Sequence, residues 1–136
     1  FCISALTVLL LFQADRSAAA EIIINPAVPT KVATIELARS IFAGRMRSWP
    51  NGKPLAVVLM PNSSTEHRYF CTHILDVFPR QLRRAWDRIR FSGTGKGPII
   101  VKTEKEMIET VRRVKGAIGY IIETTNKEGV DVLSIQ

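Results

Sequence analysis

The stretch Asn62-Ser63-Ser64-Thr65 places several hydroxyl side chains at the expected start of a helix. It follows Leu55 to Met60, an apolar run that predicts a buried strand. Ser63 and Glu66 have capping-box spacing, in which the serine side chain accepts from the Glu66 amide and the Glu66 carboxylate reaches back to the Ser63 amide. The free amides and partial positive charge of a helix N-terminus favour an oxyanion. We therefore expect the best ligand site of the chain here, with a purely structural cap as the alternative.

His67 and Cys71 lie four residues apart, on one face of the helix expected to run to about Val77. A zinc site needs three or four ligands, and the other nearby histidine, His73, falls on a different face. A nucleophile pair of Ser64 and His67 lacks an orienting carboxylate that the spacing could identify. We therefore expect no metal and no catalytic residue here, and we expect Cys71 to be a small buried hydrophobe.

The glycine-rich segment Gly93-Thr94-Gly95-Lys96-Gly97 differs from a nucleotide-binding P-loop. That motif requires glycine where Arg90 stands and serine or threonine where Gly97 stands, and it precedes a helix, whereas here a strand is expected. We expect a flexible loop and no cofactor.

Arg80, Arg84 and Arg88 form a basic stripe at helical spacing, opposite an apolar face that includes Leu82 and Trp86. Like charges at this spacing repel one another, so the stripe costs stability unless solvent or a partner screens it. A solvated face is one interpretation, and contact with an acidic protein surface or an anionic lipid is the other.

The N-terminus is typical of an exported protein. An apolar run from Phe1 to Phe12 precedes the small residues Ser17 to Ala20, as in a secretory signal peptide and its cleavage site. We expect residues 1–20 to be a signal peptide, itself truncated because the initiator methionine and basic segment are missing, with an uncleaved anchor as the alternative. Export predicts a periplasmic protein, and Cys71 is then left without a disulfide partner.

Length and composition predict one globular domain over residues 21–136. The chain has 136 residues, of which 46% are hydrophobic and 23% charged, and this excludes a low-complexity protein. The net charge of +7 favours anionic partners. Among these, nucleic acid is not expected for an exported chain.

Strand and helix patterns alternate along this domain, which predicts an α/β layered fold. The expected strands are Glu21 to Asn25, Leu55 to Met60, Pro98 to Val101, Ala117 to Ile122 and Val130 to Ile135. The expected helices run from a Thr34 cap to Ala43, from Ser63 to about Val77, from Pro79 through Ile89, and from a Thr103–Glu106 capping box to Lys115.

Three stretches together resemble the phosphate-binding proteins of bacterial ABC transporters, in the type 2 periplasmic-binding-protein superfamily. They are Ile24-Asn25-Pro26 with the helix ending Ile41-Phe42-Ala43-Gly44 and Trp49, then Val57 to Phe70, and finally Gly116-Ala117-Ile118-Gly119-Tyr120-Ile121. The resemblance implies a three-layer α/β/α lobe, similar to the second lobe only of these two-lobed proteins. It also implies binding of phosphate or a similar small oxyanion at Ser63, Ser64 and Thr65.

Two positions depart from the family pattern. Ser64 replaces a glycine between the ligand-binding serine and threonine, and Leu59 stands where relatives have an anion-pairing arginine. Arg68, one helical turn further on, could substitute for that arginine. The resulting expectation is a non-catalytic, exported oxyanion-binding protein whose second ligand wall comes from a homodimer or a partner protein. A transporter and an acidic envelope protein are the further partner candidates. The alternative is an interaction module that has lost ligand binding and uses Arg80, Arg84 and Arg88.

Overall fold

The structure is a computed structural model that describes residues 20–123 and 126–136. The expected signal peptide therefore lies outside the described residues, apart from Ala20. None of the described helices is long and apolar enough to cross a bilayer.

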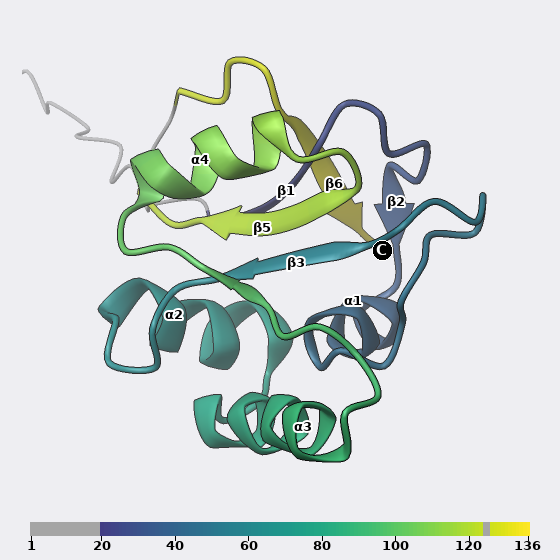
Figure 1. The fold of residues 1–136 in the computed structure, drawn as a ribbon. Helices are drawn as coiled ribbons and strands as arrows, with labels where there is room; N and C mark the ends of the chain where they lie inside the picture. The colour runs from purple at the N-terminus through teal and green to yellow at the C-terminus, as the bar shows by residue number, and fades with distance from the viewer. Residues whose placement is uncertain (1–19, 124–125) are drawn as a thin grey trace, which may run out of the picture.

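A mixed sheet of six strands forms the centre of the molecule (Figure 1). Its strand order is β2-β6-β1-β5-β3-β4. Strands β3, β4 and β5 are parallel to one another, whereas β1 runs antiparallel between β5 and β6. The bounds are Glu21–Ile24 for β1, Val32–Ala33 for β2, Ala56–Leu59 for β3, Ile99–Ile100 for β4, Ala117–Ile121 for β5 and Asp131–Ile135 for β6.

The helices cover both faces of the sheet, as expected for an α/β lobe. Helix α4 lies on one face and helices α1 and α2 on the other, while α3 packs outside α1 and α2 (Figure 1). Helix α2 continues without a break into a π-helix, η1. The bounds are Ile35–Phe42 for α1, Thr65–Tyr69 for α2, Phe70–Leu75 for η1, Pro79–Ser92 for α3 and Glu104–Arg113 for α4.

Aromatic rings join the sheet to the helices beneath it. Tyr120 of β5 stacks on Phe70 with ring centroids 4.0 Å apart, and Phe42 of α1 meets Phe70 edge-on at 4.8 Å. All three side chains are fully buried. On the other face, the buried Asn25 after β1 donates to the carbonyls of Val111 and Arg112, both at 2.9 Å, and so pairs two carbonyls in the last turn of α4.

Most expected elements are present, but one strand was not expected and one helix ends early. Strand β2 was not expected, because its two residues, Val32 and Ala33, are ordered by parallel pairing with β6 rather than by a pattern of their own. The helix expected to reach Val77 ends at Leu75, where Asp76 adopts a left-handed backbone conformation with φ 53°. The Thr34 and Thr103 caps are confirmed, each side chain accepting the amide three residues further on at 3.1 Å.

Candidate functional site

The loop between β3 and α2 lies at the carboxyl end of β3, where ligands bind in open α/β sheets. A turn in which the Ser64 amide donates to the Pro61 carbonyl at 2.9 Å brings the chain into α2. The N-cap of α2 is Ser64, whose hydroxyl accepts from the His67 amide at 3.2 Å. The expected capping box of Ser63 and Glu66 is therefore wrong by one residue, because this turn places Ser64 directly before the first helical residue.

The Ser64 hydroxyl already contacts its own loop and helix turn, including Sδ of Met60 at 3.6 Å. Besides accepting from the His67 amide, it lies 2.9 Å from Oε2 of Glu66, to which it donates. A hydroxyl has one hydrogen to donate. Ser64 therefore stabilises the loop, and its side chain is not available to a ligand while the Glu66 carboxylate keeps this position.

Two backbone amides at this helix start lack acceptors within the described chain. The amides of Thr65 and Glu66 donate to no described residue, as expected for the first turn of a helix. The side chains of Ser63 and Thr65 are exposed beside them, and Arg68 follows Thr65 by three residues on the same helix surface. The structure thus brings the expected residues together as an open cluster of donors, with the half-buried Glu66 carboxylate as a nearby repulsive charge.

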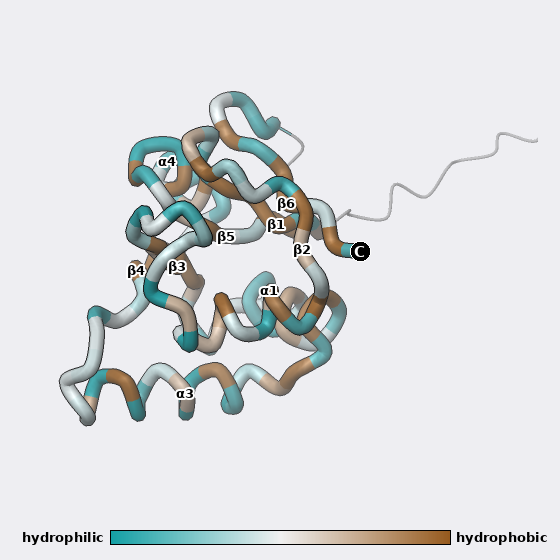
Figure 2. The backbone as a smooth tube through the Cα atoms, turned by 90° about the vertical axis from the view of Figure 1, so that its right-hand side faces the viewer, coloured by the Kyte–Doolittle hydropathy of each residue, from teal (hydrophilic) through white to brown (hydrophobic). Residues whose placement is uncertain are grey.

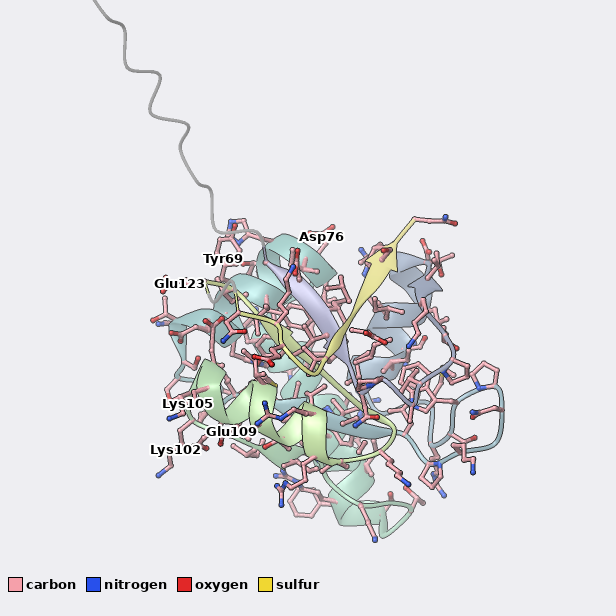
Figure 3. All side chains as sticks on the ribbon, turned by 90° about the horizontal axis from the view of Figure 1, so that it is seen from above. Tyr69, Asp76, Lys102, Lys105, Glu109 and Glu123 are labelled. Carbon is pink, nitrogen blue, oxygen red and sulfur yellow. The ribbon has the colours of Figure 1, made fainter. Side chains whose placement is uncertain are left out.

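The neighbouring parallel strands end at the same edge of the sheet. Beyond β5, the Glu104 carboxylate accepts from the amides of Ile122 and Glu123, the latter at 3.1 Å. Beyond β4, Lys102 is exposed. Figure 3 shows Lys102 and Glu123 on the same side of the molecule as Tyr69 of α2. Glu104 therefore occupies the amides at the end of β5, whereas the amides at the start of α2 are open.

A cavity of about 260 Å³ adjoins the β3–α2 loop and brings further charges near it. It lies between Met60, Pro61 and Asn62 on one side and residues of α3 on the other. Arg83 and Arg90 line it together with one acidic residue, Asp87. Sequence reasoning missed both arginines as site residues, because nothing local links α3 to a loop some twenty residues earlier.

His67 is buried, and both of its ring nitrogens contact residues other than Ser64. Its Nδ1 lies 2.7 Å from the Tyr120 hydroxyl and its Nε2 lies 3.5 Å from Sγ of Cys71. Burial lowers the pKa of His67 to about 4 and raises the pKa of Cys71 to about 12. A neutral imidazole and a protonated thiol in the core form no nucleophile pair with Ser64, and the expectation that Cys71 is buried is confirmed.

No three His, Cys, Asp or Glu side chains gather closely enough to hold a metal ion within residues 20–123 and 126–136. The glycine-rich segment from Gly93 to Gly97 connects α3 to β4. A strand thus follows it, as the sequence indicated.

The three arginines of the α3 stripe do not share one environment. Arg84 and Arg88 line a depression together with Arg39 and Arg45, which sequence reasoning did not connect to them. Arg80 is not among the lining residues, and its guanidinium lies 5.6 Å from the centroid of the Phe78 ring. Arg84 and Arg88 therefore share one depression, whereas Arg80 lies beside the Phe78 ring.

Comparison with known proteins identifies the fold. No family model matches the sequence, and no curated protein matches it. A putative phosphate ABC transporter substrate-binding protein with bound phosphate from Clostridium perfringens has a similar structure, with a TM-score of 0.68 at 18% identity over 85% of this chain and 44% of that one. PstS from Borrelia burgdorferi has a TM-score of 0.65 at 19% identity, over 86% of this chain and 47% of its own.

A third similar structure is an ABC-type phosphate transport receptor from Vibrio cholerae, with a TM-score of 0.64 at 18% identity over 84% of this chain. Its match covers 44% of the receptor. The chain thus spans less than half the length of these structures. The resemblance inferred from the sequence is confirmed at the level of the fold.

Proposed function

We propose that this chain is an oxyanion-binding lobe of a solute-binding protein, with inorganic phosphate as its best candidate ligand. The observation that carries the proposal is the pair of open amides, on Thr65 and Glu66, at the carboxyl end of β3. It is supported by the fold, because a similar structure from Clostridium perfringens is described with bound phosphate. The proposed role is binding and not catalysis, in keeping with the names of the similar proteins.

The proposed ligand accepts from the amides of Thr65 and Glu66 and from the hydroxyls of Ser63 and Thr65. Arg68 supplies positive charge from α2. Ser64 acts indirectly, by capping the helix and holding its first turn in place. Arg83 and Arg90, which line the adjoining cavity, raise the local potential and attract an anion to the loop.

A second wall is needed for tight binding. A helix terminus contributes about 0.3–1 kcal/mol to an exposed anion and about 2 kcal/mol to a partly buried one. Millimolar binding already requires about 4.1 kcal/mol. Because Ser63 and Thr65 are exposed, we propose that a partner surface closes the site: a second copy of this chain or a transporter. We place this role in the periplasm, on the basis of the expected signal peptide.

The double variant Ser63→Ala/Thr65→Val tests the ligand site. It removes two hydroxyl donors, and a hydrogen bond to a charged group contributes about 1.5–3 kcal/mol, so we expect at least about a tenfold loss of phosphate affinity. Calorimetric titration of phosphate, with sulfate and chloride for comparison, measures this loss. The matched control is Thr72→Val, because the exposed Thr72 hydroxyl bonds to the Arg68 carbonyl within its own helix.

The opposite change is expected for Glu66→Gln, which removes the repulsive carboxylate beside Ser64 and should tighten phosphate binding. Equal responses to all three salts, or unchanged phosphate binding by Ser63→Ala/Thr65→Val, would overturn the site assignment. Sedimentation with and without phosphate then shows whether a second copy supplies the missing wall.

A further inference from the structure

A basic depression of about 350 Å³ lies between α1 and α3, on the side of α1 that faces away from the sheet. Figure 2 shows α3 running along this outer side of α1. Four arginines line the depression: Arg39, Arg45, Arg84 and Arg88. The other lining residues are Gln81 and the apolar Ala43, Val77, Leu82 and Ala85.

The four arginines are poorly neutralised. Within the described parts of the chain, one ion pair reaches them, between Arg39 and the highly exposed carboxylate of Asp76 at 3.9 Å. Arg45, Arg84 and Arg88 have no carboxylate within ion-pair distance in those parts. The Arg84 and Arg88 side chains, four residues apart on one helix, repel each other. No acidic residue is among those that line the depression.

The arginines are not needed to complete the C-terminus of α1. All four carbonyls of its last turn already accept hydrogen bonds. The carbonyls of residues 39, 40 and 41 accept from backbone amides of residues 43–45. The Phe42 carbonyl accepts from the Trp86 indole at 2.9 Å. Helix termini otherwise recruit basic side chains for this purpose. Arg39 has a role of its own at the end of η1, because its Nε donates to the Leu75 carbonyl at 2.6 Å. The other three arginines have no acidic partner within the described residues.

We propose that this depression is a binding site for a compact anion that carries two or more phosphate groups. Guanidinium groups pair with phosphate through two parallel hydrogen bonds, and four of them around one hollow can hold two such groups. The volume falls in the range of ligand sites, about 300–1,000 Å³. The carboxamide of Gln81 adds further donors, because its Oε1 is already occupied by the Phe78 amide at 2.7 Å.

This site uses none of the residues of the proposed phosphate site, so the two inferences stand separately. Two sources could supply the same chemistry: a soluble oligophosphate or the headgroup of a lipid that carries two phosphate groups. An acidic protein segment is a different class of partner. The concave shape of the depression favours the compact anion.

The experiment titrates inorganic tripolyphosphate into the full chain by calorimetry and compares two double variants. Arg84→Gln/Arg88→Gln removes two charges from the depression and should weaken binding by at least about tenfold. Arg80→Gln/Arg113→Gln removes the same charge elsewhere, on α3 and α4, and should weaken it by less than about twofold. All four residues are exposed, and circular dichroism verifies that both variants fold.

Vesicles of phosphatidylcholine with and without cardiolipin distinguish the source. Retention on cardiolipin vesicles that is lost in Arg84→Gln/Arg88→Gln supports the site and assigns it to a lipid headgroup, whereas tripolyphosphate binding without retention assigns it to a soluble ligand. An equal loss in both double variants would overturn the proposal, because overall charge would explain it. It would also be overturned if neither probe bound, or if polyglutamate bound in their place. Titration of orthophosphate into Arg84→Gln/Arg88→Gln measures binding at the β3–α2 site separately, because that site does not use these two arginines.

Discussion

Burial in the core keeps His67 neutral at pH values where an exposed histidine takes up a proton. The Tyr120 hydroxyl accepts from the Met60 amide at 2.9 Å and lies 2.7 Å from Nδ1 of His67. A phenol is a stronger donor than a thiol, so the favoured arrangement has Tyr120 donating to Nδ1 and the ring proton on Nε2, facing Cys71. The neutral imidazole thus connects β5 to α2 inside the core.

Acidification should destabilise the protein through His67. Because burial lowers its pKa from 6.5 to about 4, the unfolded chain takes up a proton below pH 6.5 that the folded chain resists until about pH 4. The free energy of unfolding is therefore highest above pH 6.5, and it falls by about 3 kcal/mol in total as the pH drops to 4 and below. Urea unfolding at pH 7 and pH 4.5 measures most of this loss.

The variant His67→Gln should lose less free energy of unfolding between the two pH values than the parent chain does. The carboxylates contribute to the pH dependence of both proteins, whereas the His67 imidazole contributes only to that of the parent chain. His73→Gln removes an exposed imidazole from the same helical segment and is the matched control. If both variants retained the full pH dependence, His67 would not be its source.

At the scale of elements, the turn before β5 depends on Gly116. Its φ is 80°, and a Cβ there would lie 2.0 Å from the Pro54 carbonyl oxygen. Its own carbonyl accepts from the Trp49 indole at 2.9 Å and from the Ala56 amide at 3.1 Å. The chain must therefore approach closely here, where β3 begins beside β5.

Gly116→Ala should lower the free energy of unfolding by more than about 2 kcal/mol, because a backbone clash adds to the strain of a left-handed residue. Gly52→Ala is the control: Gly52 has the same φ of 80°, with no atom within 4 Å of the added Cβ. We expect it to cost about 1–2 kcal/mol. Denaturant midpoints of the two variants measure the difference, and equal midpoints would show that the contact with Pro54 relaxes freely.

The sequence predicted those elements that carry their own signals. The β-branched run Ile22-Ile23-Ile24 forms β1, and Thr34 and Thr103 cap helices as expected. Interactions between distant segments could not be predicted in this way. Val32 and Ala33 form a strand through β6, and consecutive hydroxyl residues before α2 offered several caps, among which the turn from Pro61 selects Ser64.

The same distinction applies to the candidate sites. Ser63, Thr65 and Arg68 were proposed as ligand residues because they are close in sequence, and in the structure they lie at one helix start. The pairing of Arg84 with Arg39 depends on how α3 packs over α1, and no local pattern contains that information. The signal that could have suggested it is the pair of arginines, Arg39 and Arg45, near the expected end of a helix.

The whole molecule carries a net charge of +7, which makes its anion binding sensitive to salt. Raising the ionic strength from about 0.01 M to about 0.15 M shortens the Debye length from about 30 Å to about 8 Å. We expect the affinity for tripolyphosphate to fall more steeply than that for orthophosphate, since its charge is larger. Calorimetry across this range measures how the affinity for each anion depends on ionic strength. Added sucrose, a neutral solute, is the control for effects unrelated to charge. Equal slopes would contradict a field-driven contribution.

The position of β1 between β5 and β6 determines when the sheet can form. β1 is the first described strand, yet its neighbours on both sides are the last two: Glu21 pairs with Ile121, and Ile24 pairs with Asp131. Such distant pairings carry a loop-closure cost and slow folding. The middle of the sheet therefore cannot close until residues up to Leu133 have been synthesised, and the pairing of β1 comes later than in a chain whose neighbouring strands follow one another.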